Sequence, residues 1–142
     1  MTDIKTYVSH STEETIDIGY QIASYLKKGD CVLLYGDLGA GKTAITKGIA
    51  SYFGFNKDNV ISPTFTIVNQ YPANVNIYHF DLYRLDSEDM LDDIGFDEYI
   101  YSDAISIIEW PECGGSRLPL NHIDVQIKYG EDMSSREITV KF

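Results

Sequence analysis

Several features that mark whole classes of proteins are missing from this 142-residue sequence. It has no stretch that approaches the roughly 20 apolar residues of a membrane helix. Its first residues, MTDIKTYVSHSTEE, lack the basic and then apolar layout of a secretory signal. The two cysteines, Cys31 and Cys113, are too few and too far apart for a disulfide framework or a zinc site. We therefore expect a soluble, cytoplasmic protein with two free thiols.

Positive charge is also scarce. The chain has 11 Lys plus Arg against 22 Asp plus Glu, which gives a formal net charge of −11. Such a surface repels the phosphate backbone of nucleic acids. Direct, tight binding of RNA or DNA is therefore disfavoured, although many ordinary soluble proteins are equally acidic.

The length and the 44% of hydrophobic residues suit one compact domain, which we assign to residues 1–142. The sequence STEE from Ser11 has the form of a capping box, and the apolar spacing after it predicts a helix that ends near Lys28. The apolar run Cys31–Tyr35 predicts a buried strand. A glycine-rich turn follows, and then a helical pattern over Thr43–Phe53. The order is strand, loop, helix.

The rest of the chain adds strands and short helices. Asp86 or Ser87 can cap a short acidic helix, and the apolar run Ala104–Ile108 predicts a second buried strand. Two antiparallel hairpins are predicted, the second at an edge of the sheet: Phe65–Val68 with Val75–Phe80, and Ile123–Tyr129 with Glu137–Phe142. The pattern predicts an α/β fold with a mixed central sheet flanked by helices and antiparallel hairpins.

The glycine-rich turn reads GDLGAGKT and starts at Gly36. It fits the pattern G-x-x-x-x-G-K-[ST], whose glycines let backbone N–H groups approach phosphate oxygens. Lys42 then pairs with the β- and γ-phosphates, and the Thr43 hydroxyl completes the Mg²⁺ shell. We predict a single-domain P-loop NTPase whose nucleotide-binding residues include Asp37, Leu38, Gly39, Ala40, Gly41, Lys42 and Thr43.

A site of this kind also needs a carboxylate that holds Mg²⁺ through its waters, at the end of a neighbouring buried strand. Glu109 ends the nearly unbroken apolar run Ile105–Ile108 and is by this argument the stronger metal ligand. Asp81 ends the more alternating run Asn76–Phe80 and is assigned to orient or deprotonate the attacking water. The sequence leaves the division of roles between the two acids open.

Two further residues are assigned to the site. Thr64, in the segment Ser62–Phe65, lies about twenty residues past Lys42, where many P-loop switch enzymes place a loop that senses the γ-phosphate. A plain turn before a strand fits that segment equally well. Trp110 follows Glu109 and can cover a nucleotide or a partner surface, or be a half-buried structural residue. The three histidines are scattered and are taken as ordinary surface or core residues.

No convincing guanine-reading motif is present. Asn56–Asn59 resembles Asn-Lys-x-Asp, but its Asp is one place early. Asp92–Gly95 matches Asp-x-x-Gly, but it follows an acidic helical stretch rather than a strand. We therefore expect the nucleotide to be ATP.

Four segments, in this order and in so short a chain, resemble those of one family. They are GDLGAGKT, then Ser62–Phe65, then HFDLYR from His79, then IEWPE from Ile108. They are similar to the corresponding segments of the TsaE family, which comprises the bacterial ATPases of tRNA threonylcarbamoyl-adenosine synthesis. The resemblance implies that Lys42 and Thr43 bind phosphate and Mg²⁺, and that Asp81, Glu109 and Trp110 complete the catalytic face.

The resemblance also implies a complex with the paralogous proteins TsaB and TsaD, in which ATP hydrolysis resets the transferase between turnovers. Little activity is expected from the isolated chain, because none of its three arginines has a spacing that commits it as an arginine finger. Two alternatives stay open. A small-molecule P-loop kinase needs an arginine-rich lid, which the sequence does not offer. A nucleotide-binding assembly scaffold with incidental hydrolysis would make Asp81 and Glu109 dispensable.

Overall fold

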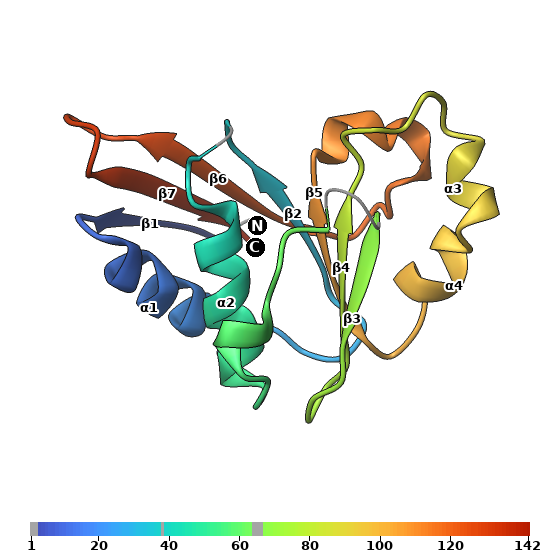
Figure 1. The fold of residues 1–142 in the computed structure, drawn as a ribbon, viewed down its shortest axis with the longest axis horizontal. Coiled ribbons are helices and arrows are strands. Elements are labelled where there is room, and N and C mark those ends of the chain that lie inside the picture. Colours follow the sequence, from blue (N-terminus) through green and yellow to red (C-terminus); the bar gives the residue numbers. More distant parts are fainter. Residues whose placement is uncertain (1–2, 38, 64–66) are drawn as a thin grey trace.

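The chain folds around one seven-stranded sheet (Figure 1). The computed structural model describes residues 3–37, 39–63 and 67–142. The strand order is β1-β7-β6-β2-β5-β4-β3. The four strands β6, β2, β5 and β4 are parallel, whereas β1, β7 and β3 are antiparallel to their neighbours. The bounds are β1 Ile4–Ser9, β2 Cys31–Tyr35, β3 Val68–Tyr71, β4 Ile77–Asp81, β5 Ile105–Glu109, β6 Ile123–Tyr129 and β7 Arg136–Lys141.

Helices cover both faces of the sheet, so the central strands are buried on both sides (Figure 1). On β2, Val32 and Leu34 pack with α1 and α2, whereas Cys31 and Leu33 pack with α3 and α4. This arrangement confirms the predicted mixed sheet flanked by helices. The helices are α1 Thr12–Ala23, α2 Lys42–Tyr52, α3 Met90–Asp93 and α4 Phe96–Ile100, with 3₁₀ turns at Lys57–Asn59, Pro111–Cys113 and Gly115–Arg117.

Both cysteines are free, as predicted. Cys31 lies in the core, and burial raises the pKa of its thiol to about 12, so the thiol stays protonated near neutral pH. In the described parts of the chain, no helix combines the length and the apolar character needed to cross a membrane.

Glycines at the contact of α1 and α2 let the two helix backbones touch. A Cβ added at Gly48 would overlap the carbonyl oxygen of Ile16 and lie 2.6 Å from Tyr20 N. A Cβ added at Gly19 would overlap the carbonyl oxygen of Ile45. Only hydrogen fits at either position, and α2 is therefore fixed against α1 directly after the glycine-rich loop.

The first helix begins as predicted but ends earlier. The Ser11 hydroxyl accepts a hydrogen bond from Glu14 N at 3.1 Å, which caps α1. The helix stops at Ala23 rather than near Lys28. The reason is Ser24, whose hydroxyl donates to the Gln21 carbonyl at 2.6 Å and so competes for the backbone acceptors of the last turn.

The C-terminal hairpin of β6 and β7 is confirmed, but the prediction that it lies at an edge of the sheet is wrong. The edge strand is β1, which the sequence did not predict and which pairs antiparallel with β7. Only Ser9 of this strand is buried, while Ile4 and Val8 are exposed. The strand therefore lacks the apolar alternation by which a strand is recognised.

Two other boundaries differ from the prediction. The strand that pairs with β4 runs over Val68–Tyr71, after Ile67 adopts a φ of 69°, and so extends past the predicted end at Val68; the predicted strand residues Phe65 and Thr66 lie outside the described residues. The acidic helix α3 begins at Met90 with Asp89 in the cap position and no side-chain capping bond, so neither Asp86 nor Ser87 caps it.

Candidate functional site

Strand alternation places three polar residues of β4 and β5 on the face that α2 covers. His79 and Asp81 lie on β4 in line with the core residue Ile77, and Glu109 lies on β5 in line with Ile107. The parallel register sets Asp81 directly beside Glu109. Only 7% of Asp81 and 4% of Glu109 are exposed. The two parallel strands thus present both predicted acids at the same edge of the sheet.

The loop between β2 and α2 contains the predicted glycine-rich turn. Gly39 and Gly41 have φ values of 78° and 117°, which favour glycine. Ala40 N donates to the Asp37 carbonyl at 3.0 Å, which tightens the turn. Helix α2 begins at Lys42, and Gly41 caps it without a side-chain hydrogen bond. The N–H groups of the first turn, at the positive end of the helix dipole, are therefore left for another acceptor.

These elements meet at a pocket of about 240 Å³, which we call the central pocket. The loop and α2 form one wall, the ends of β4 and β5 form another, and the segment that follows the Lys57–Asn59 turn closes a third side. The lining residues are Gly39, Gly41, Lys42, Thr43, Ser62, Asp81, Glu109 and Trp110. All of these except Ser62 belong to the predicted site, so the fold brings together residues that are far apart in the sequence.

Lys42 is the buried cation of the central pocket, with 6% of the residue exposed. Its Nζ lies 4.0 Å from Glu109 Oε1 and 4.1 Å from the centroid of the Trp110 ring. Neither contact is a hydrogen bond, and within the described ranges Nζ has no hydrogen-bond partner. A buried ammonium group without an acceptor is costly. The hydrogen-bond donors of Lys42 are therefore available to an acceptor that enters the pocket.

The two acids are held by different contacts. Glu109 Oε2 accepts a hydrogen bond of 2.6 Å from His79 Nε2, and His79 is fully buried. Asp81 Oδ1 accepts one of 3.0 Å from Tyr83 N. Sequence reasoning missed His79 because it treated the histidines as scattered. The available signal was its position two residues before Asp81 on a strand, which places both side chains on one face.

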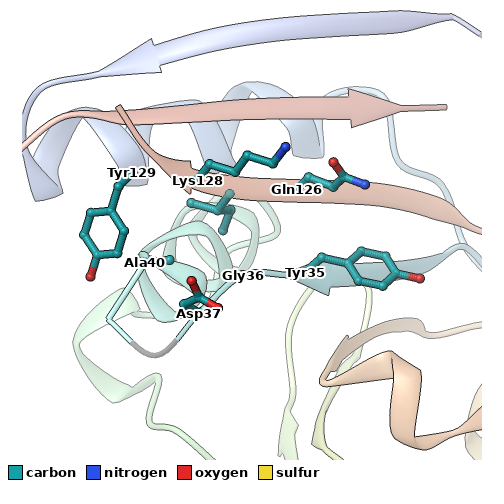
Figure 2. Close-up of a pocket in the computed structure, with 8 residues that line it drawn as sticks. Tyr35, Gly36, Asp37, Ala40, Gln126, Lys128 and Tyr129 are labelled. Atoms are coloured by element: carbon teal, nitrogen blue, oxygen red, sulfur yellow. The ribbon is translucent and has the colours of Figure 1, made fainter. Parts of the chain in front are cut away.

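Some predicted residues lie elsewhere. Asp37 and Ala40 border a second pocket, of about 570 Å³, at the ends of β2 and β6 (Figure 2). We call it the outer pocket; Figure 2 shows Asp37 on the loop, below Lys128 of β6. Leu38 and Thr64 fall outside the described residues, so the predicted contacts of these two side chains stay predictions.

Arg136 on β7 supports the loop and was not predicted to do so. Its Nε donates to the Ala40 carbonyl at 2.9 Å, and its guanidinium group stacks on the Tyr129 ring at 4.2 Å. Arg117, another of the three arginines, binds Asp92 and Asp97 with its Nη2. Neither arginine lines the central pocket.

A third pocket, of about 250 Å³, adjoins the central one. We call it the side pocket. It shares Gly39 and Gly41 with the central pocket and extends over Ala44 to the start of α1 and to the loop before β7. Its lining residues are His10, Ser11, Thr12, Thr15, Gly39, Ala40, Gly41, Ala44, Ser134 and Arg136.

A parallel sheet strand, a glycine-rich loop of the form GxxxxGKT and a helix that begins at the Lys define the P-loop NTPase fold. The model of the family described as "Threonylcarbamoyl adenosine biosynthesis protein TsaE" matches residues 9–138. The chain therefore belongs to the TsaE family, whose members take part in tRNA threonylcarbamoyladenosine biosynthesis.

Individual relatives agree with this assignment. The TsaE protein of Bacillus subtilis is 42% identical over 128 residues, which cover 89% of this chain and 78% of that protein. The TsaE protein of Treponema pallidum is 38% identical over 133 residues, which cover 94% of this chain and 97% of that protein. The crystal structure of YdiB from Bacillus subtilis is similar with a TM-score of 0.81 and 33% identity, over 99% of this chain and 86% of that one.

Proposed function

We propose that this chain is a cytoplasmic, Mg²⁺-dependent ATPase that supports tRNA threonylcarbamoyladenosine modification as the partner of TsaB and TsaD. The observation that carries the proposal is the Lys42 ammonium group, which is buried, positioned at the start of α2 and without a hydrogen-bond partner in the described ranges. The β- and γ-phosphates of ATP would supply the missing acceptors. The N–H groups of the first turn of α2 and the helix dipole favour the same charge.

The shape of the site suggests how ATP would lie. The phosphates would occupy the central pocket, and the ribose and base would extend past Gly41 and Ala44 into the side pocket, which shares Gly39 and Gly41 with it. Arg136 would hold the glycine-rich loop in place through its hydrogen bond to the Ala40 carbonyl. The outer pocket lies beyond the loop and plays no part in this arrangement.

The residues of the central pocket fit Mg²⁺, which prefers hard oxygen ligands and few protein groups. Thr43 brings a hydroxyl group and Glu109 and Asp81 bring carboxylates to one pocket. No group of three His, Cys, Asp or Glu side chains is arranged for a metal in the described part of the chain. When bound, Mg²⁺ would neutralise charge on the leaving diphosphate.

The protein's own groups would then act in defined places. Lys42 would neutralise developing charge on the β- and γ-phosphates, and Asp81, beside Glu109, would orient the attacking water. Arg117 and Arg136 are committed to other contacts. We therefore propose that positive charge from a partner completes the site and that the isolated chain is slow.

The direct test is hydrolysis of Mg·ATP by the chain alone and with TsaB and TsaD, with GTP as the control. Slow turnover that rises with both partners and prefers ATP is the expected result. ATP that binds and promotes assembly without partner-stimulated hydrolysis would instead identify the assembly scaffold. Equal use of GTP would leave a nucleotide binder without base selectivity.

Glu109→Gln should keep the fold and abolish most of the turnover. The amide has the same size and its oxygen can still accept the hydrogen bond from His79 Nε2, but it removes the negative charge from the metal site. We expect turnover to fall by about 10²- to 10³-fold and the Mg²⁺ dependence of ATP affinity to disappear. Binding measured with Mg²⁺ and with EDTA gives the second quantity.

Asp81→Asn separates the two roles, because it should lower turnover while ATP affinity keeps its dependence on Mg²⁺. Glu112→Gln, an exposed acid nearby, is the matched control and should change neither quantity. If Asp81→Asn, and not Glu109→Gln, removed the Mg²⁺ dependence, the two assignments would have to be exchanged.

A further inference from the structure

A chain of buried hydrogen bonds runs from Glu109 away from the central pocket. Glu109 Oε2 and His79 Nε2 are 2.6 Å apart, and His79 Nδ1 and the Tyr71 hydroxyl are 3.0 Å apart. The Tyr71 hydroxyl is also 2.9 Å from the carbonyl oxygen of Ile61. His79 is fully buried and Tyr71 is 3% exposed. Two side chains that do not line the pocket thus connect its acid to the segment before Ser62.

The chemistry of the groups fixes the direction of these bonds. A carboxylate oxygen only accepts, so His79 Nε2 carries a hydrogen and donates to Glu109. In the neutral ring Nδ1 is then an acceptor, and the Tyr71 hydroxyl is placed to donate to it. Burial raises the pKa of Tyr71, so the phenol keeps this proton. The phenol has one proton, so at any moment it donates either to His79 Nδ1 or to the Ile61 carbonyl, and that carbonyl also accepts from Asn69 Nδ2 at 3.2 Å.

The bond from His79 restricts the Glu109 carboxylate. The terminal torsion of a glutamate is broad, so a free carboxylate can present either oxygen over a wide range of angles. Here Oε2 is held by a ring that is itself packed in the core, and Oε1 is left 4.0 Å from Lys42 Nζ. One defined oxygen therefore faces the pocket. Such outer contacts are what sets the orientation of a ligand or catalytic group.

We propose that His79 and Tyr71 are positioning residues that hold Glu109 with Oε1 toward Lys42. This inference rests on the proposed ATPase function. In this proposal, neither His79 nor Tyr71 touches the substrate.

Three variants test the proposal in the full chain with TsaB and TsaD present. His79→Leu removes both hydrogen bonds of the ring. His79→Gln places an amide nitrogen at about the distance of Nε2 from the backbone, and so restores a donor for Glu109. Tyr71→Phe deletes one oxygen atom from the outer end of the chain and is the variant least able to disturb folding. The quantities measured are kcat, the KM for Mg·ATP and the melting temperature.

We expect His79→Leu to lower kcat by about 10- to 100-fold and to raise the KM for Mg·ATP as well, because Glu109 is the proposed Mg²⁺ ligand of the bound state. His79→Gln should recover most of the lost kcat. Tyr71→Phe should lower kcat by about three- to tenfold. In the double variant Tyr71→Phe/His79→Leu, kcat should equal that of His79→Leu alone, because Tyr71 acts only through His79.

A merely structural role predicts a different result. Ile107→Val is the matched control, since Ile107 is buried in register with His79 but its side chain has no group that can donate a hydrogen bond to Glu109. It should lower the melting temperature and leave kcat unchanged. If Tyr71→Phe and both His79 variants keep wild-type kcat, or if Gln fails to recover what Leu loses, the positioning role is wrong. If the wild-type chain hydrolyses no ATP with its partners, the proposed function itself fails.

Discussion

Lys42→Met is expected to have opposite effects on function and on stability. Turnover of ATP should fall by about 10²- to 10³-fold, because the buried ammonium is the group placed to take up charge on the phosphates. Without nucleotide, however, the free energy of unfolding should rise by about 1 kcal/mol, because methionine fills the same space and removes a buried ammonium that makes no hydrogen bond and whose ion pair with Glu109 is long, at 4.0 Å, while Glu109 keeps its hydrogen bond from His79. Chemical denaturation and the ATPase assay measure the two effects separately.

Lys47→Met is the control for this prediction. It makes the same change five residues further along α2, at a residue that does not line the central pocket, and it should change neither turnover nor the free energy of unfolding much. Adding Mg·ATP should stabilise the wild-type chain and not the Lys42→Met variant. A Lys42→Met chain that is clearly less stable than wild type would mean that the ammonium already has an adequate partner in the free protein.

Gly48→Ala is expected to have the largest effect on stability. In an ordinary helix this change is favourable by up to about 1 kcal/mol. At this position the added Cβ would overlap the Ile16 carbonyl oxygen and come within 2.8 Å of Gly19 Cα. Backbone atoms cannot rotate away, so the two helices must separate. We expect a net loss of about 3 kcal/mol, measured by chemical denaturation.

Two alanine substitutions in α1 separate the effect of steric crowding from that of helix propensity. Gly19→Ala should be destabilising to a similar degree, because its Cβ meets the Ile45 backbone from the other helix. Asp17→Ala on the exposed side of α1 should change stability by less than about 0.5 kcal/mol. A stable Gly48→Ala protein would contradict the direct contact of the two backbones. Loss of ATP binding together with stability is expected, because α2 carries Lys42 and Thr43.

The parts of the site that sequence predicts are those encoded by local patterns. The β2, loop and α2 order follows from an apolar run, a glycine motif and helical spacing within residues 31–53. Glu109 was identified because a strand buried on both faces ends at it. Each of these signals needs only neighbouring residues.

The parts that could not be predicted depend on contacts between distant segments. The bond of His79 to Glu109 requires the register between β4 and β5. The support of the loop by Arg136 requires β7 to lie near it. The strand β1 has too little burial to leave an apolar pattern. The local sequence does not indicate the register between strands or which strands become neighbours. These contacts can therefore be identified only in the folded structure.

The order of the strands has a consequence for how the protein is made. Strand β1 pairs with β7, and β2 lies between β5 and β6, so the early strands find their partners only in the later part of the chain. A ribosome therefore releases α1 and α2, whose mutual contact is local, well before the sheet they cover can form. Until the last strands emerge, the apolar faces of these helices are available to chaperones and to other nascent chains.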